Sequence, residues 1–151
     1  MLHYIIDGNN LIGKIKSFSS LQKKDKQSAR EKLTFYLERY FSSKKTKVTL
    51  HFDGYENLPI KTQKIIIVYS ENKTADQKIK RQIETSNSPK NIIVITSDNN
   101  IKEFAKVCSA KTISSEDFNS EIQKEKNENE ESERIKEINN VEEFKRIFNV
   151  K

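Results

Sequence analysis

The sequence predicts an α/β domain built on a mostly parallel sheet. Short apolar runs alternate along the chain with amphipathic stretches, which is the pattern of repeated strand–helix units. The apolar runs are rich in β-branched residues, as expected for strands that helices cover on both faces. At 151 residues, the chain has room for one domain with a sizeable core.

Five apolar runs are predicted to form strands, and the periodic stretches between them are predicted to form helices. The predicted strands are Leu2 to Ile6, Val48 to Phe52, Ile65 to Tyr69, Asn91 to Ile95 and Lys111 to Ile113. The predicted helices are Asp25 to Phe41, Ala75 to Glu84, Asn99 to Val107 and one that begins near Ser115. This alternation favours a roughly five-stranded sheet flanked by helices.

The composition changes near residue 124, where the stretch KEKNENEESER contains no apolar residue. We interpret this stretch as a solvated linker or helix end. Beyond it, a spacing of three or four predicts an amphipathic helix with a stripe of Ile135, Ile138, Val141, Phe144 and Phe148. The stripe either packs back on the domain or binds a partner, and packing is favoured. We therefore divide the chain into a domain over residues 1–123 and a charged linker with a C-terminal helix over residues 124–151.

The positive charge is concentrated in the main domain. Residues 1–120 carry 21 lysines and arginines against 13 acidic residues, whereas residues 121–151 carry seven against nine. Such a field suits a polyanion, although a lysine-rich surface alone explains it equally well. The single cysteine, Cys108, excludes an internal disulfide and a Cys-rich zinc site. Without a signal peptide or a membrane-spanning run, the chain is expected to be cytoplasmic, with no membrane partner.

Four aspartates follow predicted strands or begin a predicted helix. Asp7, Asp53 and Asp98 each come after an apolar run, and Asp76 follows the predicted helix cap Thr74. Since the carboxyl ends of parallel strands converge on one edge of a sheet, these acids are expected to become neighbours. Carboxylates about 4 Å apart repel by roughly 4 kcal/mol at an effective dielectric near 20, so a cluster shares protons or holds a cation. The pattern therefore predicts a candidate metal site.

Each aspartate also has a purely structural interpretation. Asp7 and Asp53 precede glycine and are typical of turns. Asp76 lies in the first turn of a helix that a capping box at Thr74 would start, where its charge favours the helix dipole. Asp98 would cap the next helix. The joint pattern favours the metal site, because capping does not require all four acids to lie at one end of a sheet.

The predicted ligands indicate which metal would bind. Carboxylate oxygens without thiolate or imidazole partners point to Mg²⁺ or Mn²⁺. His3 and His51 precede the predicted strand ends, and we interpret both as strand side chains rather than ligands.

Taken in order, these motifs resemble the NYN family of PIN-like ribonucleases, especially its YacP-like bacterial branch. The matching stretches are IIDGNNLIG, HFDG, TADQKI and VITSD. A later stretch, SAKTISSEDF, is similar to the short fifth strand and helix of that branch, although Cys108-Ser109 stands where a glycine turn is expected. The resemblance covers about residues 3–118. It implies a three-layer PIN-like (Rossmannoid) fold, a nuclease domain over residues 1–123, a sheet order near 3-2-1-4-5 and metal-dependent endonucleolytic cleavage of RNA.

The resemblance also implies roles for individual residues. Asp7, Asp76 and Asp98 match the acids that hold the metal ion. Asn10 matches the polar residue that orients the first acid, and Ser97 matches the small hydroxyl before the last one. These residues form the expected catalytic site.

The expected mechanism follows from charge. A divalent ion would lower the pKa of a water molecule and neutralise charge on the scissile phosphate. Asp53, which matches a second-strand position of the branch, is either a ligand or a neighbour that accepts the proton of the water. The resemblance implies 5′-phosphate and 3′-hydroxyl products. The expected partner is RNA, with mRNA decay, RNA processing and action on the ribosome left open, and no nucleotide cofactor is expected.

Basic side chains flank the predicted acids and are expected to contact RNA phosphates without reading the base sequence. They are Lys14, Lys16, Arg30, Lys61, Lys64, Lys73, Lys78, Lys80 and Arg81. Tyr55, in the loop after Asp53, either stacks on an unpaired base or packs on its own domain, and packing is favoured.

Other classes of protein fit parts of the pattern. A receiver domain would use Asp53 as phosphoacceptor and Thr96 near a later strand end, but it needs adjacent acids where Gly8 and Asn9 follow Asp7. A non-catalytic RNA-binding module would keep the fold without the chemistry, whereas all the expected acids are present. A dinucleotide-binding domain is disfavoured because the sequence has no G-x-G-x-x-G motif.

Overall fold

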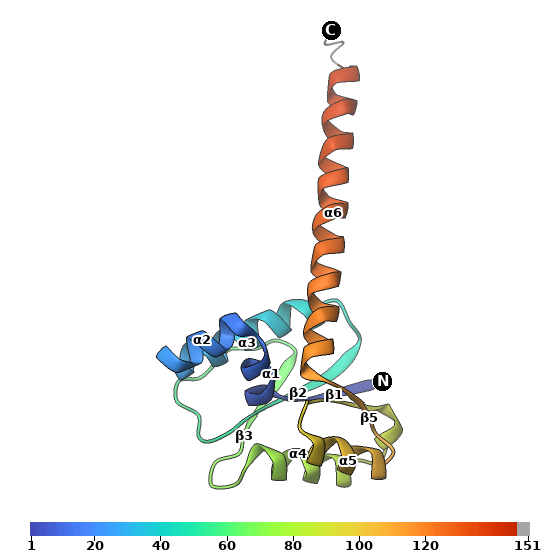
Figure 1. Cartoon of the computed structure of the whole chain (residues 1–151). Coiled ribbons are helices and arrows are strands. Elements are labelled where there is room, and N and C mark those ends of the chain that lie inside the picture. The colour runs from blue at the N-terminus through green and yellow to red at the C-terminus, as the bar shows by residue number, and fades with distance from the viewer. Residues whose placement is uncertain (148–151) are drawn as a thin grey trace. The chain divides into compact units, whose positions relative to one another are not determined.

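Figure 1 shows the computed structural model of the chain. It describes the backbone of residues 1–147 and the side chains of residues 1–142. Of the apolar stripe predicted at the C-terminus, Phe148 and the side chain of Phe144 lie outside the described residues.

A five-stranded parallel sheet forms the centre of the domain. Its strand order is β3-β2-β1-β4-β5, and each pair of neighbours is parallel. The strands are β1 (Leu2–Asp7), β2 (Thr46–Phe52), β3 (Ile65–Tyr69), β4 (Ile92–Ile95) and β5 (Lys111–Ile113). The predicted fold class and strand order are therefore confirmed. The order also separates the chain from receiver domains, whose sheets follow the order 2-1-3-4-5.

Over residues 1–147, six helices and one short 3-10 turn connect and follow the strands. They are α1 (Gly8–Lys14), α2 (Lys16–Lys24), α3 (Lys26–Phe41), α4 (Ala75–Glu84), η1 (Pro89–Asn91), α5 (Asn99–Val107) and α6 (Ser115–Ile147). The helices α1 and α2 were not predicted, because each has fewer than ten residues. Tertiary packing stabilises α1 by burying Leu11 and Ile12 completely.

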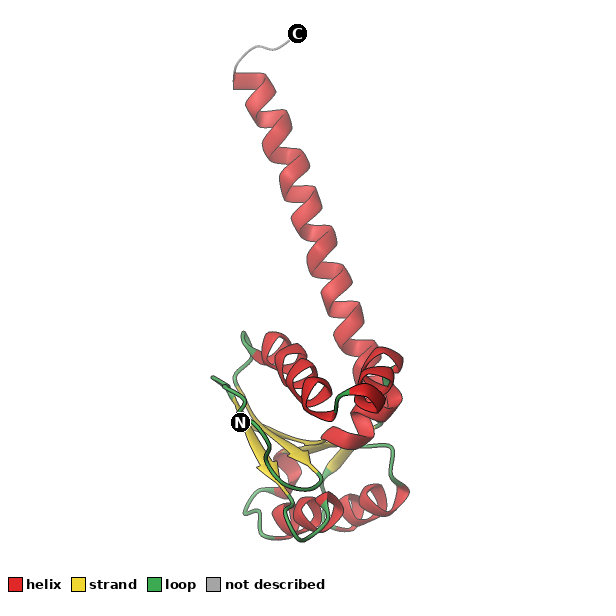
Figure 2. Ribbon diagram, turned by 90° about the vertical axis from the view of Figure 1, so that its left-hand side faces the viewer, coloured by secondary structure: helices red, strands yellow, loops and turns green. Residues whose placement is uncertain are grey.

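Helices cover both faces of the sheet (Figures 1 and 2). The helices α1, α2 and α3 lie over one face, and α4 and α5 lie over the other. Neighbouring residues of β1 pack against the helices on opposite faces of the sheet, because side chains alternate along a strand. The ring of Tyr4 lies 5.0 Å from that of Phe41 and 6.1 Å from that of Phe118, whereas Ile5 packs with Ile79 beneath the other face. The result is the expected three-layer α/β architecture.

The chain divides into two compact units, Met1–Asn119 and Ser120–Lys151, with the boundary inside α6. The charged stretch after residue 124 is helical and continuous with the C-terminal helix. Within this second unit, Ile135, Ile138 and Val141 are exposed to solvent. None of the helices in the described part of the chain is long and apolar enough to cross a membrane.

Gly8 allows α1 to start directly against β2. A Cβ atom on Gly8 would lie 2.5 Å from the carbonyl oxygen of His51 and 2.8 Å from the ring of Phe52. We expect Gly8→Ala to lower the free energy of unfolding by about 1–3 kcal/mol, because backbone and ring must move. Urea denaturation followed by circular dichroism measures this change.

Gly13, in the same helix, provides the matched control. No atom lies within 4 Å of a Cβ atom placed there. Gly13→Ala should raise the free energy of unfolding by about 0.5–1 kcal/mol, because alanine loses less backbone entropy in a helix. Equal effects of the two substitutions would contradict the close approach at Gly8.

Candidate active site

Asp7 ends the central strand β1 and is buried, with only 8 % of its surface exposed. The hydroxyl of Thr96 donates a hydrogen bond to its Oδ2 at 3.0 Å. The backbone N–H of Asn10 donates to its Oδ1 at 3.5 Å, so Asp7 also caps α1. The carboxylate is thus held in place by the residue after β4 on one side and by the first turn of α1 on the other.

Asp98 lies beside Asp7 because Thr96 links the two. The Thr96 hydroxyl that donates to Asp7 also accepts a hydrogen bond from the backbone N–H of Asp98 at 3.1 Å. The Asp98 carboxylate in turn accepts bonds from the N–H groups of Asn100 and Ile101 at 2.8 and 3.2 Å, which caps α5. Thr96 was not among the predicted site residues. Its place directly after β4 was the signal that could have identified it.

Asp53 connects the end of β2 to the start of α4. Its Oδ1 accepts a hydrogen bond from the backbone N–H of Ala75 at 2.7 Å, and its own N–H donates to Oδ1 of Asn9 at 2.9 Å. Asp53 therefore positions the helix that carries Asp76, in addition to organising its own turn.

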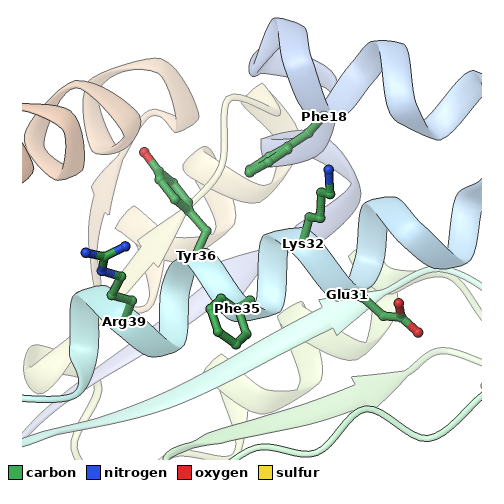
Figure 3. A pocket seen from close by; sticks show the side chains of 6 residues that line it. All are labelled: Phe18, Glu31, Lys32, Phe35, Tyr36 and Arg39. Carbon is green, nitrogen blue, oxygen red and sulfur yellow. The ribbon is translucent and has the colours of Figure 1, made fainter.

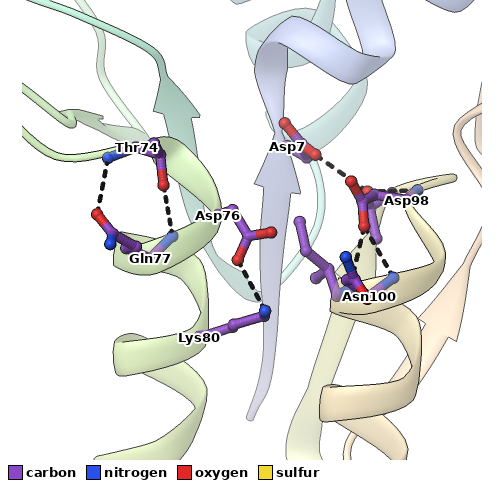
Figure 4. A network of polar contacts seen from close by, with 9 residues as sticks. Asp7, Thr74, Asp76, Gln77, Lys80, Asp98 and Asn100 are labelled. Carbon is purple, nitrogen blue, oxygen red and sulfur yellow. Dashed lines mark hydrogen bonds and ion pairs between the residues drawn. The ribbon is translucent and has the colours of Figure 1, made fainter.

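Asp76 lies in the first turn of α4, which begins with the predicted capping box at Thr74. It forms an ion pair with Lys80 at 3.0 Å, and both side chains are about one-third exposed. Figure 4 shows Asp76 on α4 together with Asp7 at the end of β1 and Asp98 at the start of α5.

The electrostatics of the site are dominated by the burial of Asp7. Burial raises the pKa of Asp7 to about 6, and the charges of Asp53 and Asp98 add to this effect, while the hydrogen bonds from Thr96 and Asn10 oppose it. The structure thus brings Asp53 and Asp98 each within electrostatic range of Asp7. Asp76 instead has Lys80 as its partner. As the described residues are placed, no three acids, histidines or cysteines are close enough to share a metal ion.

Asn10 and Ser97 join the site to the start of α6. Oδ1 of Asn10 accepts hydrogen bonds from the N–H of Ser97 at 3.0 Å and from the hydroxyl of Ser115 at 2.7 Å. The hydroxyl of Ser97 donates to the carboxylate of Glu116 and accepts from the N–H of Ser115 at 3.0 Å. Only the backbone of Asn10 contacts Asp7, so its side chain orders the neighbouring loops instead.

Glu116 is a further acid at this edge that the sequence analysis missed. The hydrogen bond from Ser97 lowers its pKa, and the charges of Lys14 and Lys102 lower it further. It follows β5 by three residues. The rule that selected the other acids, a carboxylate just after a parallel strand, would therefore have selected Glu116 as well.

His3 and His51 belong to strands, as predicted, and help to attach α4 to the sheet. Gln82 of α4 hydrogen-bonds to Nε2 of His51 at 2.7 Å and to Oγ1 of Thr49 at 3.1 Å, and Thr49 hydrogen-bonds to His3 at 2.8 Å. Burial lowers the pKa of both histidines, that of His3 to about 4. Both are therefore neutral at pH 7.

Arg30 has a structural role in place of the RNA contact predicted for it. It is only 3 % exposed. Its guanidinium donates to the carbonyl oxygens of Asp53 at 2.6 Å and Tyr55 at 2.9 Å, and lies over the rings of Phe52 and Tyr69 at 5.4 and 5.2 Å. These contacts hold the loop after β2 in position but leave the guanidinium inaccessible to a phosphate.

The other predicted RNA contacts fall into two groups. Lys14, Lys16, Lys73, Lys78, Lys80 and Arg81 belong to α1, α2, α4 and the loop before α4. Lys61 and Lys64 precede β3 and so lie at the amino end of the parallel strands, opposite the acids. Tyr55 is 62 % exposed, which does not fit the favoured expectation that it packs on its own domain. The structure therefore does not gather all the predicted cations around one site.

A sequence model of the YacP-like NYN domain matches residues 4–149, almost the whole chain. The chain belongs to this family. Its members are PIN-like nucleases that act on RNA and are typically metal-dependent. No match was found among curated protein sequences.

Two similar crystal structures are both of Rae1 (YacP) from Bacillus subtilis. The first has 23 % sequence identity and a TM-score of 0.74, covering 97 % of this chain and 87 % of that chain. The second, a point mutant, has 24 % identity and a TM-score of 0.72, covering 91 % and 82 %. At this identity, the likeness establishes the shared fold and leaves the chemistry to be argued from the site.

The raised pKa of Asp7 gives a testable dependence of stability on pH. Its value of about 6 in the folded chain lies above the ordinary 3.8, so the folded state binds the proton more tightly than the unfolded state. The contribution of Asp7 to stability therefore falls as the pH rises from about 4 to about 6 and stays low above that range. In metal-free buffer, Asp7→Asn should raise the free energy of unfolding at pH 7 by about 2–3 kcal/mol, with little effect near pH 4.

Urea denaturation of both proteins at the two pH values measures this difference. The lowered pKa values of His3 and His51 act in the opposite direction, since these groups reduce stability as the pH falls below about 6.5. Both histidines are present in wild type and variant, so the difference between the two proteins isolates Asp7. A difference that does not change with pH would contradict the shift.

Proposed function

We propose that this protein is a metal-dependent endoribonuclease that hydrolyses phosphodiester bonds in RNA. The observation that carries the proposal is the buried carboxylate of Asp7, which experiences the negative charges of Asp53 and Asp98. Within the described part of the chain, no lysine or arginine forms an ion pair with it. In a family of nucleases that act on RNA, such an uncompensated cluster fits a bound cation.

The chemistry of the donor set suits a hard divalent ion, and the side chains would have to move closer together to share it. The candidate ligands are the carboxylates of Asp7, Asp76 and Asp98, and such oxygen donors favour Mg²⁺ or Mn²⁺. Asp76 would exchange its partner Lys80 for the cation. When bound, the ion would offset the charge of the scissile phosphate and make a water molecule more acidic.

The protein's own groups supply the remaining steps. Asp53 is held at the start of α4 by its bond to the N–H of Ala75, its charge acts on Asp7, and its carboxylate can accept the proton of the attacking water. The oxygen of the water forms a bond to phosphorus while the bond to the 3′ oxygen breaks, and that oxygen takes up a proton. The products are a 5′-phosphate and a 3′-hydroxyl.

Cations near the acid edge would hold the RNA backbone. Lys14 is close enough to Glu116 to lower its pKa, and Lys78 has the same effect on His51, so both lie near the site. Lys16, Lys73 and Arg81 would extend this contact to neighbouring phosphates. Such contacts position the strand and do not read its bases.

A non-catalytic RNA-binding module is the second candidate. It is favoured by one observation, that Asp53, Asp76 and Asp98 each already have a partner that stabilises the fold. Under this alternative, the acids serve only as helix caps and an ion pair.

Asp98→Asn separates the two candidates. Asparagine keeps an oxygen that can accept the hydrogen bonds capping α5, so the fold should be retained, but the charge is lost. With Mg²⁺ or Mn²⁺ present, we expect cleavage of a labelled RNA to fall by about 100-fold or more. RNA binding, measured by fluorescence anisotropy, should change by less than about threefold.

Glu103→Gln is the matched control, because it removes an exposed charge from the same helix. It should leave cleavage unchanged. Full activity of Asp98→Asn would rule out its role as a ligand. A wild-type protein that binds RNA but does not cut it with either ion would favour the binding module.

A further inference from the structure

An exposed aromatic side chain and three cationic side chains lie together around the outer face of α3. Phe35 is 77 % exposed. Lys32 and Arg39 are three residues before it and four residues after it, which places them on the same face of the helix. Lys61 comes from the segment before β3. We call these four residues the α3 patch.

The surface of the α3 patch is hollowed on both sides of Phe35. One hollow, of about 390 Å³, lies between Phe35 and Phe18 of α2 (Figure 3). A second, of about 820 Å³, lies between Phe35 and Lys61. Phe35 and Arg39 line both hollows, so the two adjoin. The edge of Phe18 is supported by Tyr36, whose ring it meets at 5.5 Å and nearly at right angles.

The acids beside the α3 patch are already engaged by the protein. The carboxylate of Glu38 accepts hydrogen bonds from the N–H groups of Gln63 and Lys64 at 3.1 Å and of Ile65 at 2.9 Å. That of Glu31 accepts a bond from the side chain of Gln27 at 3.0 Å. Among the described side chains, none forms an ion pair with Lys32, Arg39 or Lys61. The patch therefore presents three cations outside any ion pair around an exposed ring, and the charges of Glu31 and Glu38, which line the two hollows, offset them only in part.

We propose that the α3 patch binds single-stranded RNA outside the cleavage site, with an unpaired base stacked on Phe35 and phosphates held by Lys32, Arg39 and Lys61. An aromatic platform within a row of cations is the usual means of holding a single strand. A protein partner fits less well, because its interface would have to desolvate two lysines and an arginine, and lysine is depleted in protein interfaces.

The same helix leads from the α3 patch to the acid edge. Arg30, one and a half turns before Phe35, donates to the carbonyl oxygen of Asp53. The two residues are about 7–8 Å apart along the helix axis. One RNA strand can therefore extend from the acids along α3. The inference rests on the proposed function to this extent, that RNA is the substrate at the acid edge.

The test compares Phe35→Ala with wild type in binding to two RNAs. A labelled 12-nucleotide oligouridylate and a labelled RNA duplex are titrated in EDTA, so that no cleavage takes place, and anisotropy gives each Kd. We expect Phe35→Ala to weaken binding of the single strand by about fivefold or more. Duplex binding should not change, because the paired bases offer no free face. Val107→Ala, which removes an exposed apolar side chain from α5, should change neither.

The phosphate contacts of the cations are tested by the salt dependence of RNA binding. The double variant Arg39→Gln with Lys61→Gln should reduce the slope of log Kd against log salt by about 1.4, or 0.7 for each lost phosphate contact. Phe35→Ala should leave that slope unchanged, since stacking releases no counterions. Because these side chains are on the surface, each variant should keep the thermal unfolding midpoint of wild type, which is measured in parallel.

The outcomes also separate this inference from the nuclease proposal. If Phe35→Ala binds the oligouridylate as tightly as wild type, or loses single-strand and duplex binding equally, the α3 patch is not a stacking site. If the wild type is a dimer that Phe35→Ala dissociates, the patch is a contact between copies and the inference fails. If the selective loss is seen but wild type cuts no RNA with Mg²⁺ or Mn²⁺, the patch stands and the nuclease proposal fails.

Discussion

The burial of the Asp7 carboxylate at the end of the central strand organises the edge of the sheet that carries the other candidate acids. β1 is flanked by β2 and β4, so Asp7 has Asp53 on one side and Asp98 on the other. Burying a charge beside like charges is unfavourable, and for this reason the pKa of Asp7 is raised. The hydroxyl of Thr96 and the first turn of α1 offset part of it.

The structural and catalytic interpretations of these acids are compatible. Asp7 caps α1, Asp98 caps α5, and Asp53 accepts the first N–H of α4. The amino ends of three helices therefore face the same carboxylates, and their dipoles stabilise the negative charge. The acids hold the helices that surround them, so a substitution that removes only charge, while keeping the oxygen acceptor, is needed to separate chemistry from folding.

Support for the site extends into the core of the domain. Arg30 holds the loop after β2 by hydrogen bonds to two of its carbonyl groups. Gln82 attaches α4 to the histidines of β1 and β2. Arg30 and His51 are buried, His3 and Gln82 are partly buried, and their bonds span large distances in sequence. Such networks resist rearrangement because an unpaired polar group in the interior is costly. They keep the edge that carries Asp7 rigid, whereas the exposed ring of Phe35 on α3 remains accessible to a ligand.

Local sequence determined the five strands, the helices α3, α4 and α5 and the start of α6 to within two residues. β3, β5, α4 and α5 have the predicted bounds, because clear apolar runs and a capping box mark them. It also identified Asp7 and Asp98 as neighbours, since parallel strands place their carboxyl ends together. The local sequence did not predict the short helices α1 and α2, because helices of this length depend on contacts made by the folded chain.

Only the tertiary structure decided which partner each side chain acquires. In the folded chain Arg30 is a buried support for the loop after β2, and Thr96 lies between two acids. Lys61 lies at the end of the sheet away from those acids, where it lines the same hollow as Phe35. Periodicity and capping depend on residues a few positions apart and can be read from the sequence, whereas burial and electrostatics depend on residues that only the folded chain brings together.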